Sequence, residues 1–128
     1  MRILIVDDDS MNLAYCTEAL EEIARAQGAV VEITSAADGR EGLELFYAQP
    51  CAFDYILSDF DMPQMDGVRM LHLILNREPG QNVAMMTFDS REANRRFRAL
   101  KRRVTVFDKP VEFAEIRKHL KRCGLELK

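Results

Sequence analysis

Residues 53–63 read Phe-Asp-Tyr-Ile-Leu-Ser-Asp-Phe-Asp-Met-Pro, and this stretch decides the fold. It begins as a short, mainly apolar run that predicts a strand, and it ends in the acids Asp59 and Asp61. A helical pattern starts at about Asp66 and is closed by Pro79-Gly80. A strand that ends in acids and leads into a helix is typical of α/β folds, in which the site lies outside the carboxyl ends of parallel strands.

The same alternation of strand and helix continues on both sides of this stretch. Further strands are predicted at about 3–6, 30–34, 83–87 and 104–107. The first helix is expected to have Ser10 or Asn12 as its cap and to end at Gly28, and the fourth is expected to bury Phe97 and Leu100. After a turn at 37–39, the second helix is expected to end before Pro50, and the helices after the fourth and fifth strands are expected at about 92–101 and 113–123. Five βα units of this kind predict a mainly parallel sheet with right-handed crossovers.

The composition fits one soluble globular domain. The chain has 128 residues, of which 48% are hydrophobic and 30% charged, and we expect one domain over 1–128 with no output domain. No apolar run approaches the ~20 residues that cross a bilayer, and Met1-Arg2 leads straight into a strand pattern, so a cytoplasmic protein is expected. The cysteines are widely spaced and are expected to be reduced and structural; they are Cys16, Cys51 and Cys123.

Polar side chains gather where the predicted strands end. They are Asp7 and Asp8 after the first strand, Asp59 in the third, Thr87 in the fourth and Lys109 after the fifth. Because the carboxyl ends of parallel strands meet at one edge of a sheet, these side chains should converge. Two carboxylates about 4 Å apart repel by roughly 4 kcal/mol at an effective dielectric near 20, so three acids require a proton or a cation. Mg²⁺ or Mn²⁺, which prefers hard oxygen ligands, is the expected cofactor.

These residue types together suggest phosphate chemistry. A carboxylate beside a metal ion and an ammonium group can act as a nucleophile toward a phosphoryl group. Lys109 is placed to supply the ammonium, and Thr87 can donate its hydroxyl to a phosphoryl oxygen. That hydrogen bond would exist only in the modified state, which is what a switch requires.

On these motifs the sequence resembles the receiver domain of two-component response regulators, including the chemotaxis type. The resemblance covers essentially the whole chain. The motifs that carry it are Ile-Leu-Ile-Val-Asp-Asp at 3–8, Ser-Asp-Phe-Asp-Met-Pro-Gln-Met-Asp-Gly at 58–67, Thr87, and Lys109-Pro110. It implies a doubly wound, flavodoxin-like (βα)5 fold with a five-stranded parallel sheet of order 2-1-3-4-5, and a cis peptide bond before Pro110.

The resemblance also implies roles and partners. Asp59 would be the phospho-acceptor, with Thr87 and Lys109 contacting the phosphoryl group. The donor would be a phosphohistidine of a sensor histidine kinase or histidine phosphotransfer protein, and the surface around the fourth helix, fifth strand and fifth helix would signal to a protein target or output domain. Such a domain is a signalling module and not a turnover enzyme, with no membrane partner, no nucleic acid expected and homodimer formation left open. The implied metal ligands are Asp7 (mainly through water), Asp8, Asp59 and Asp61 (by its backbone carbonyl).

The sequence departs from the family at two positions near this set. Val106 stands where the family usually has Tyr or Phe, and Phe107 comes next, which puts switching by an aromatic residue in question. Phe88 stands where a small residue is usual and predicts slower phosphorylation. The departures leave an alternative, a phosphorylation-impaired receiver that acts as a constitutive protein-docking module. The basic stretch 91–103 is interpreted as a solvated helix face, with an acidic partner or nucleic acid as the alternatives.

Other polar residues receive structural interpretations. His72 and His119 are expected to face solvent or to pack, since both lie in predicted helices. The Asp59-x-Asp61 pattern also resembles the nucleophile motif of haloacid dehalogenase phosphatases, but the order of motifs argues against that family, because Asp7-Asp8 comes first here. Four acids are interpreted as turn residues or helix caps: Asp9, Asp38, Asp54 and Asp66.

Overall fold

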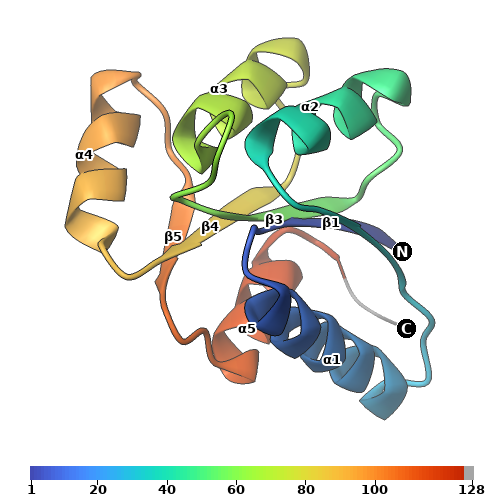
Figure 1. Cartoon of the computed structure of the whole chain (residues 1–128). Coiled ribbons are helices and arrows are strands. Elements are labelled where there is room, and N and C mark those ends of the chain that lie inside the picture. Colours follow the sequence, from blue (N-terminus) through green and yellow to red (C-terminus); the bar gives the residue numbers. More distant parts are fainter. Residues whose placement is uncertain (126–128) are drawn as a thin grey trace.

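The computed structural model describes residues 1–125 and has a five-stranded parallel sheet between two layers of helices (Figure 1). The strands are β1 (Arg2–Val6), β2 (Glu32–Ala36), β3 (Tyr55–Asp59), β4 (Val83–Thr87) and β5 (Thr105–Asp108). The helices are α1 (Ser10–Ala26), α2 (Gly39–Ala48), α3 (Gly67–Arg77), α4 (Ser90–Ala99) and α5 (Phe113–Arg122). The strand order β2-β1-β3-β4-β5, with all neighbours parallel, confirms the doubly wound fold. No helix within residues 1–125 is long and apolar enough to span a membrane.

Two apolar clusters hold the helices against the sheet. Helices α2, α3 and α4 cover one face and α1 and α5 the other, as Figure 1 shows. Along β1 the side chains alternate, so that Leu4 and Val6 join the first cluster while Ile3 and Ile5 join the second. Because both faces are covered, the central strands must be apolar on both sides, which explains the continuous apolar run of β1.

Aspartate side chains accept hydrogen bonds from the first backbone N–H groups of four helices. The expectation that Ser10 or Asn12 caps α1 was wrong, because Asp9 precedes the helix and accepts the amide of Asn12. Asp54 accepts the backbone N–H of Arg2, which confirms its structural role. The capping residues of α1 to α4 are Asp9, Asp38, Asp66 and Asp89, and the first three had been assigned such roles from the sequence.

Two element boundaries also differ from the prediction. Strand β2 begins at Glu32, and Val30, which was assigned to it, is 84% exposed. Helix α4 ends at Ala99, so Leu100 is the residue that ends the helix and is 39% exposed instead of buried. The next residue, Lys101, has a φ of 56° and turns the chain away from the helix.

The histidine of α5 packs in the core, as predicted. His119 is 7% exposed, and its Nδ1 lies 2.6 Å from the hydroxyl oxygen of the fully buried Tyr55. Phe107 contacts the same imidazole edge to face. Burial lowers the pKa of His119, and the charge of Arg122 lowers it further, so the imidazole is neutral at neutral pH. The peptide bond before Pro110 is cis, as the family resemblance implied.

Candidate functional site

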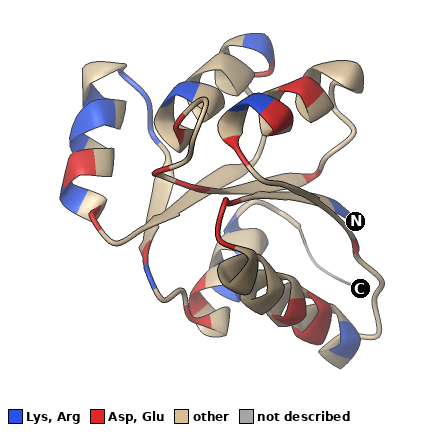
Figure 2. Ribbon diagram, in the orientation of Figure 1, with Lys and Arg blue, Asp and Glu red and all other residues tan. Residues whose placement is uncertain are grey.

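The carboxyl ends of β1 and β3 bring three acids together at one edge of the sheet. Carboxylate oxygens of Asp7, Asp8 and Asp59 all lie within 4.8 Å of one another. Asp7 is fully buried and Asp59 is 7% exposed, whereas Asp8 is open to solvent. Figure 2 shows the acidic segments at these strand ends. The structure therefore assembles the acidic cluster that the sequence predicted.

Lys109 joins this cluster from the end of β5. Its Nζ lies 2.8 Å from Asp59 Oδ1 and 3.6 Å from Asp7 Oδ2, and its side chain is 8% exposed. One ammonium faces three carboxylates, so the cluster keeps an excess of negative charge that a divalent cation would balance.

Burial changes the acid–base properties of this pair. It raises the pKa of Asp59 from 3.8 to about 6, with a further rise from the charge of Asp7, while the hydrogen bond from Lys109 opposes the change. Burial lowers the pKa of Lys109, but the hydrogen bond and charge of Asp59, together with Asp7, outweigh it and leave the pKa raised. At neutral pH the carboxylate is therefore mostly ionised and the ammonium is charged.

Asp7 is fixed by two amide groups of the chain that follows it. The backbone N–H of Asp9 donates to Asp7 Oδ1 at 2.9 Å, and the side-chain amide of Asn12 donates to Asp7 Oδ2 at 2.5 Å. These bonds direct the Asp7 carboxylate toward the cluster and satisfy its buried oxygens. The sequence pattern predicts only a capping role for Asn12. One feature of the sequence could have indicated this hydrogen bond. Asn12 lies in the first turn of a helix that directly follows an acid at the end of a strand.

Gly67 lets the start of α3 lie against the backbone of Asp59. Its N–H donates to the carbonyl oxygen of Phe60 at 2.8 Å. A Cβ atom at position 67 would lie 2.0 Å from the carbonyl oxygen of Asp59 and 2.9 Å from the hydroxyl of Ser58. Only glycine permits this approach, so the end of β3 that carries Asp59 depends on Gly67.

Thr87 lies at the same strand edge but is hydrogen bonded to the start of α4. The residue is 3% exposed, and its Oγ1 accepts the backbone N–H of Asp89 at 2.9 Å. Its carbonyl oxygen accepts the N–H of Lys109, which ties β4 to the residue after β5. Asp61, in contrast, is exposed in the loop after β3 and lies outside the group of three acids.

The two departures from the family pattern lie in different environments. Phe88 is 83% exposed, and its ring centroid is 5.4 Å from Lys109 Nζ, a cation–π contact beside the acidic cluster. Val106 packs with the α4 side of the sheet, whereas Phe107 lies on the opposite face with α5. Because neighbouring strand residues point to opposite faces, Phe107 does not replace an aromatic residue at position 106.

Comparison with known proteins identifies the family. Residues 3–121 match the family model described as the response regulator receiver domain. The chain is 35% identical over 74 residues to the probable chemotaxis protein CheY of Rhizobium etli, covering 58% of this chain and 52% of that protein. It is 36% identical over 74 residues to the two-component response regulator ARR12 of Arabidopsis thaliana, covering 58% of this chain and 11% of that protein. The matched region thus spans about half the length of the first relative and about a tenth of the length of the second.

A solved structure gives the same result. The CheY-like receiver domain protein of Methanospirillum hungatei superposes with a TM-score of 0.74 at 28% identity, covering 94% of this chain and 90% of that one.

Proposed function

The chain belongs to the response regulator receiver domain family, and from this we propose that it is a phospho-switch in which Asp59 accepts a phosphoryl group from a phosphohistidine. The observation that carries the proposal is the 2.8 Å contact between Lys109 Nζ and Asp59 Oδ1, beside Asp7 and Asp8. This contact supports the proposal, because the ammonium could stabilise the charge on a group transferred to the buried Asp59 carboxylate. We propose that the donor is a sensor histidine kinase or a histidine phosphotransfer protein.

The acidic cluster fits a bound Mg²⁺ or Mn²⁺. Its carboxylate oxygens are hard ligands within 4.8 Å of one another, and one ammonium does not balance their charge. When bound, the ion supplies positive charge against the phosphoryl oxygens. We propose that Asp7, Asp8 and Asp59 hold it, together with the backbone carbonyl of Asp61.

In the proposed reaction an Asp59 oxygen forms a bond to phosphorus while the P–N bond of the donor histidine breaks. The imidazole nitrogen takes the bonding electron pair and a proton from solvent. The pKa of about 6 leaves Asp59 mostly ionised at neutral pH, as a nucleophile must be. Lys109 keeps its charge beside the reacting carboxylate because the pKa of the ammonium is raised. The chain carries one phosphoryl group as a signal and is not a turnover enzyme.

Thr87 provides the link from the modified aspartate to α4. Its hydroxyl oxygen accepts the N–H of Asp89, so the hydroxyl hydrogen is available to a phosphoryl oxygen. Asp89 is also the residue that caps α4. Movement of Thr87 toward Asp59 would therefore act directly on the start of this helix. We propose that a protein target or output domain recognises the resulting change in the surface formed by α4, β5 and α5.

A phosphorylation-impaired docking module is not favoured. The acidic set and its lysine partner are complete, and Phe88 is 83% exposed, so its ring does not fill the space between the carboxylates.

The test is intact-mass measurement after incubation with acetyl phosphate, with either Mg²⁺ or EDTA present. The wild-type chain and Glu18→Gln, a variant at an exposed acid of α1 outside the cluster, should gain one phosphoryl group in Mg²⁺ only. Asp59→Asn should gain none. An adduct on Asp59→Asn, or no wild-type adduct from either acetyl phosphate or a phosphorylated histidine phosphotransfer protein, would contradict the proposal.

A further inference from the structure

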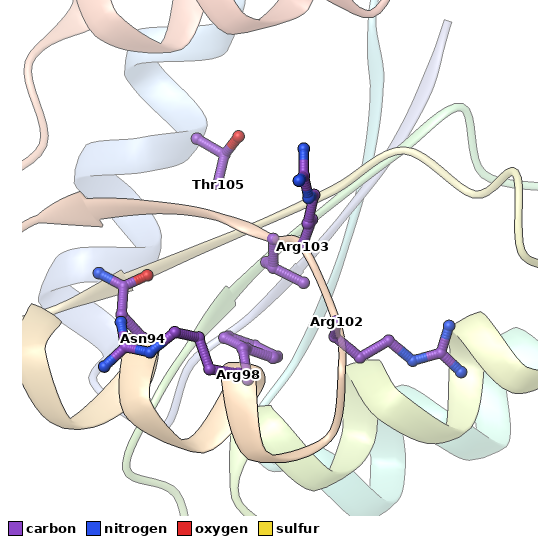
Figure 3. Close-up of a pocket in the computed structure, with 7 residues that line it drawn as sticks. Asn94, Arg98, Arg102, Arg103 and Thr105 are labelled. Atoms are coloured by element: carbon purple, nitrogen blue, oxygen red, sulfur yellow. The ribbon is translucent and has the colours of Figure 1, made fainter.

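A second group of charged side chains lies away from the acidic cluster, where α4 ends and β5 begins. Figure 2 shows that Lys and Arg dominate this part of the chain. Side chains from the end of α4 and the segment before β5 enclose a surface hollow of about 340 Å³, which we call the basic groove (Figure 3). Its polar lining consists of Asn94, Arg98, Arg102, Arg103 and Thr105.

None of the three arginines of the groove has its charge neutralised by an acid of the described chain, although Arg102 donates hydrogen bonds to the side chains of His72 and Asn76. Arg98 and Arg103 are exposed, and neither forms an ion pair with any acid in residues 1–125. Their neighbours differ, since Arg95 and Arg96 each pair with a carboxylate. A planar guanidinium binds a carboxylate through two parallel hydrogen bonds, so unpaired arginines at a hollow favour an anionic ligand.

The directions of the arginines indicate what kind of anion fits. In Figure 3, Arg98 runs along α4 toward Asn94, Arg103 projects on the other side of the chain, and Arg102 points toward α3. Arg102 is held there by a hydrogen bond from its Nε to His72 Nδ1 at 3.2 Å. Because the guanidinium groups point apart, they do not enclose a single phosphate. They match a ligand whose negative charges are spread along its length.

The rest of the lining favours a protein segment over a nucleic acid. Val104, which is only partly buried, provides apolar surface for a hydrophobic side chain, while Asn94 and Thr105 can form hydrogen bonds with a peptide backbone. A nucleic acid presents one charge per ~1.7 Å of duplex and needs an extended basic surface. The chain has a net charge of −3, and its acidic cluster lies at the other end of β5.

We propose that the basic groove binds an acidic segment of a partner protein. Carboxylates of the segment pair with Arg98 and Arg103, and an apolar side chain packs against Val104. This binding does not require phosphorylation, and only its regulation through α4 rests on the proposed function.

The test uses fluorescence anisotropy of a labelled synthetic peptide in which Glu and Asp alternate with Leu, with the full chain, low salt and no phosphodonor. A peptide with Gln and Asn in place of the acids is the ligand control. The double variant Arg98→Gln/Arg103→Gln should raise the Kd of the acidic peptide about tenfold, the effect of losing two exposed ion pairs. Arg25→Gln/Arg40→Gln changes the net charge equally, at α1 and α2, and should leave the Kd within about twofold.

Three results would overturn the proposal. They are equal binding of the amide peptide, an equal loss in both double variants, and tighter binding of a mixed-sequence DNA duplex that also depends on Arg98 and Arg103. Circular dichroism verifies that each variant is folded. Because the assay contains no phosphodonor, its outcome is independent of whether Asp59 is phosphorylated.

Discussion

Replacing Asp59 with Asn should stabilise the metal-free protein at neutral pH, although it removes the proposed phospho-acceptor. The Asp59 side chain is 10% exposed and lies beside two other carboxylates. Burial and the charge of Asp7 raise its pKa from 3.8 to about 6 against the opposing contact of Lys109, so the fold favours the protonated form. Asparagine has the shape and neutrality of that form and keeps an oxygen that can accept the Lys109 hydrogen bond.

The sign of the effect follows from the raised pKa. A carboxyl group with a raised pKa binds its proton more tightly in the folded chain than in the unfolded chain. The stability that this proton binding contributes is complete below about pH 3.8 and is lost as the pH rises through about 6. At about 1.36 kcal/mol per unit, the interval corresponds to at most about 3 kcal/mol. We expect Asp59→Asn to gain about 1–3 kcal/mol near neutral pH and almost nothing near pH 4.

Urea denaturation measures the free energy of unfolding of each variant. The transition is followed by circular dichroism, because the chain has no tryptophan whose fluorescence could report it. In EDTA, the free energy of unfolding of Asp59→Asn minus that of the wild type should rise between about pH 4 and 6 and then level off. Subtraction removes the contributions of other titrating groups. Asp61→Asn, at an exposed acid in the loop that follows β3, should differ from the wild type by less than about 0.5 kcal/mol. Added Mg²⁺ should reduce this difference in the free energy of unfolding, because it stabilises the wild type. Two results would refute this reasoning. The first is a difference in the free energy of unfolding that does not change with pH, and the second is an Asp59→Asn variant that is less stable than the wild type at neutral pH.

Three other substitutions probe the surroundings of the site. Gly67→Ala should lower the free energy of unfolding by about 1–3 kcal/mol in urea denaturation, because its Cβ would lie 2.0 Å from the carbonyl oxygen of Asp59. Tyr55→Phe should lower it by about 1–2 kcal/mol, because the 2.6 Å contact with His119 Nδ1 is lost in the core. Phe88→Ala should increase the initial rate of phosphorylation by acetyl phosphate severalfold, measured by intact mass, because an exposed ring beside the site is removed.

Each of these variants has a matched control. Gly80→Ala adds a Cβ with no atom within 4 Å and should leave stability within about 0.5 kcal/mol of the wild type. Tyr47→Phe removes a hydroxyl from a tyrosine that is 42% exposed, and Val30→Ala removes an exposed apolar side chain distant from the site. A control that changes as much as its partner variant would mean that the proposed contact is not the cause. An unchanged phosphorylation rate in Phe88→Ala would mean that the ring does not limit access.

The fold and most of the acidic cluster could be predicted because both depend on where strands end. An apolar run covered on both faces is recognisable from composition, and parallel strands bring their carboxyl ends to one edge. The strand pattern therefore predicts that Asp7, Asp8 and Asp59 lie together, as they do, and Lys109 contacts two of them. Element boundaries were less accurate, as Val30 shows, because the chain enters β2 only where pairing with β1 begins.

Contacts that depend on side-chain direction could not be predicted from spacing. The bond from Asn12 to Asp7 depends on how the first turn of α1 is oriented above β1. The approach of Gly67 to the Asp59 carbonyl depends on the position of α3, which no local pattern specifies. The charge of stretch 91–103 was visible in the sequence, but which of its arginines are paired was not, because that depends on the packing of α4 against α3.

The acidic cluster and the basic groove lie at opposite ends of the same pair of elements. Lys109 directly follows β5 and Arg103 precedes it, and four strand residues span about 13 Å, so the two sites can be occupied together. Helix α4 joins them, since its first turn is capped by Asp89, which is bonded to Thr87, and its last turn carries Arg98. A ten-residue helix moves as a rigid element, so a shift at its start also displaces Arg98 relative to β5. If Asp59 is phosphorylated as we propose, the change would therefore be detected as a change in the affinity of the basic groove for an acidic segment.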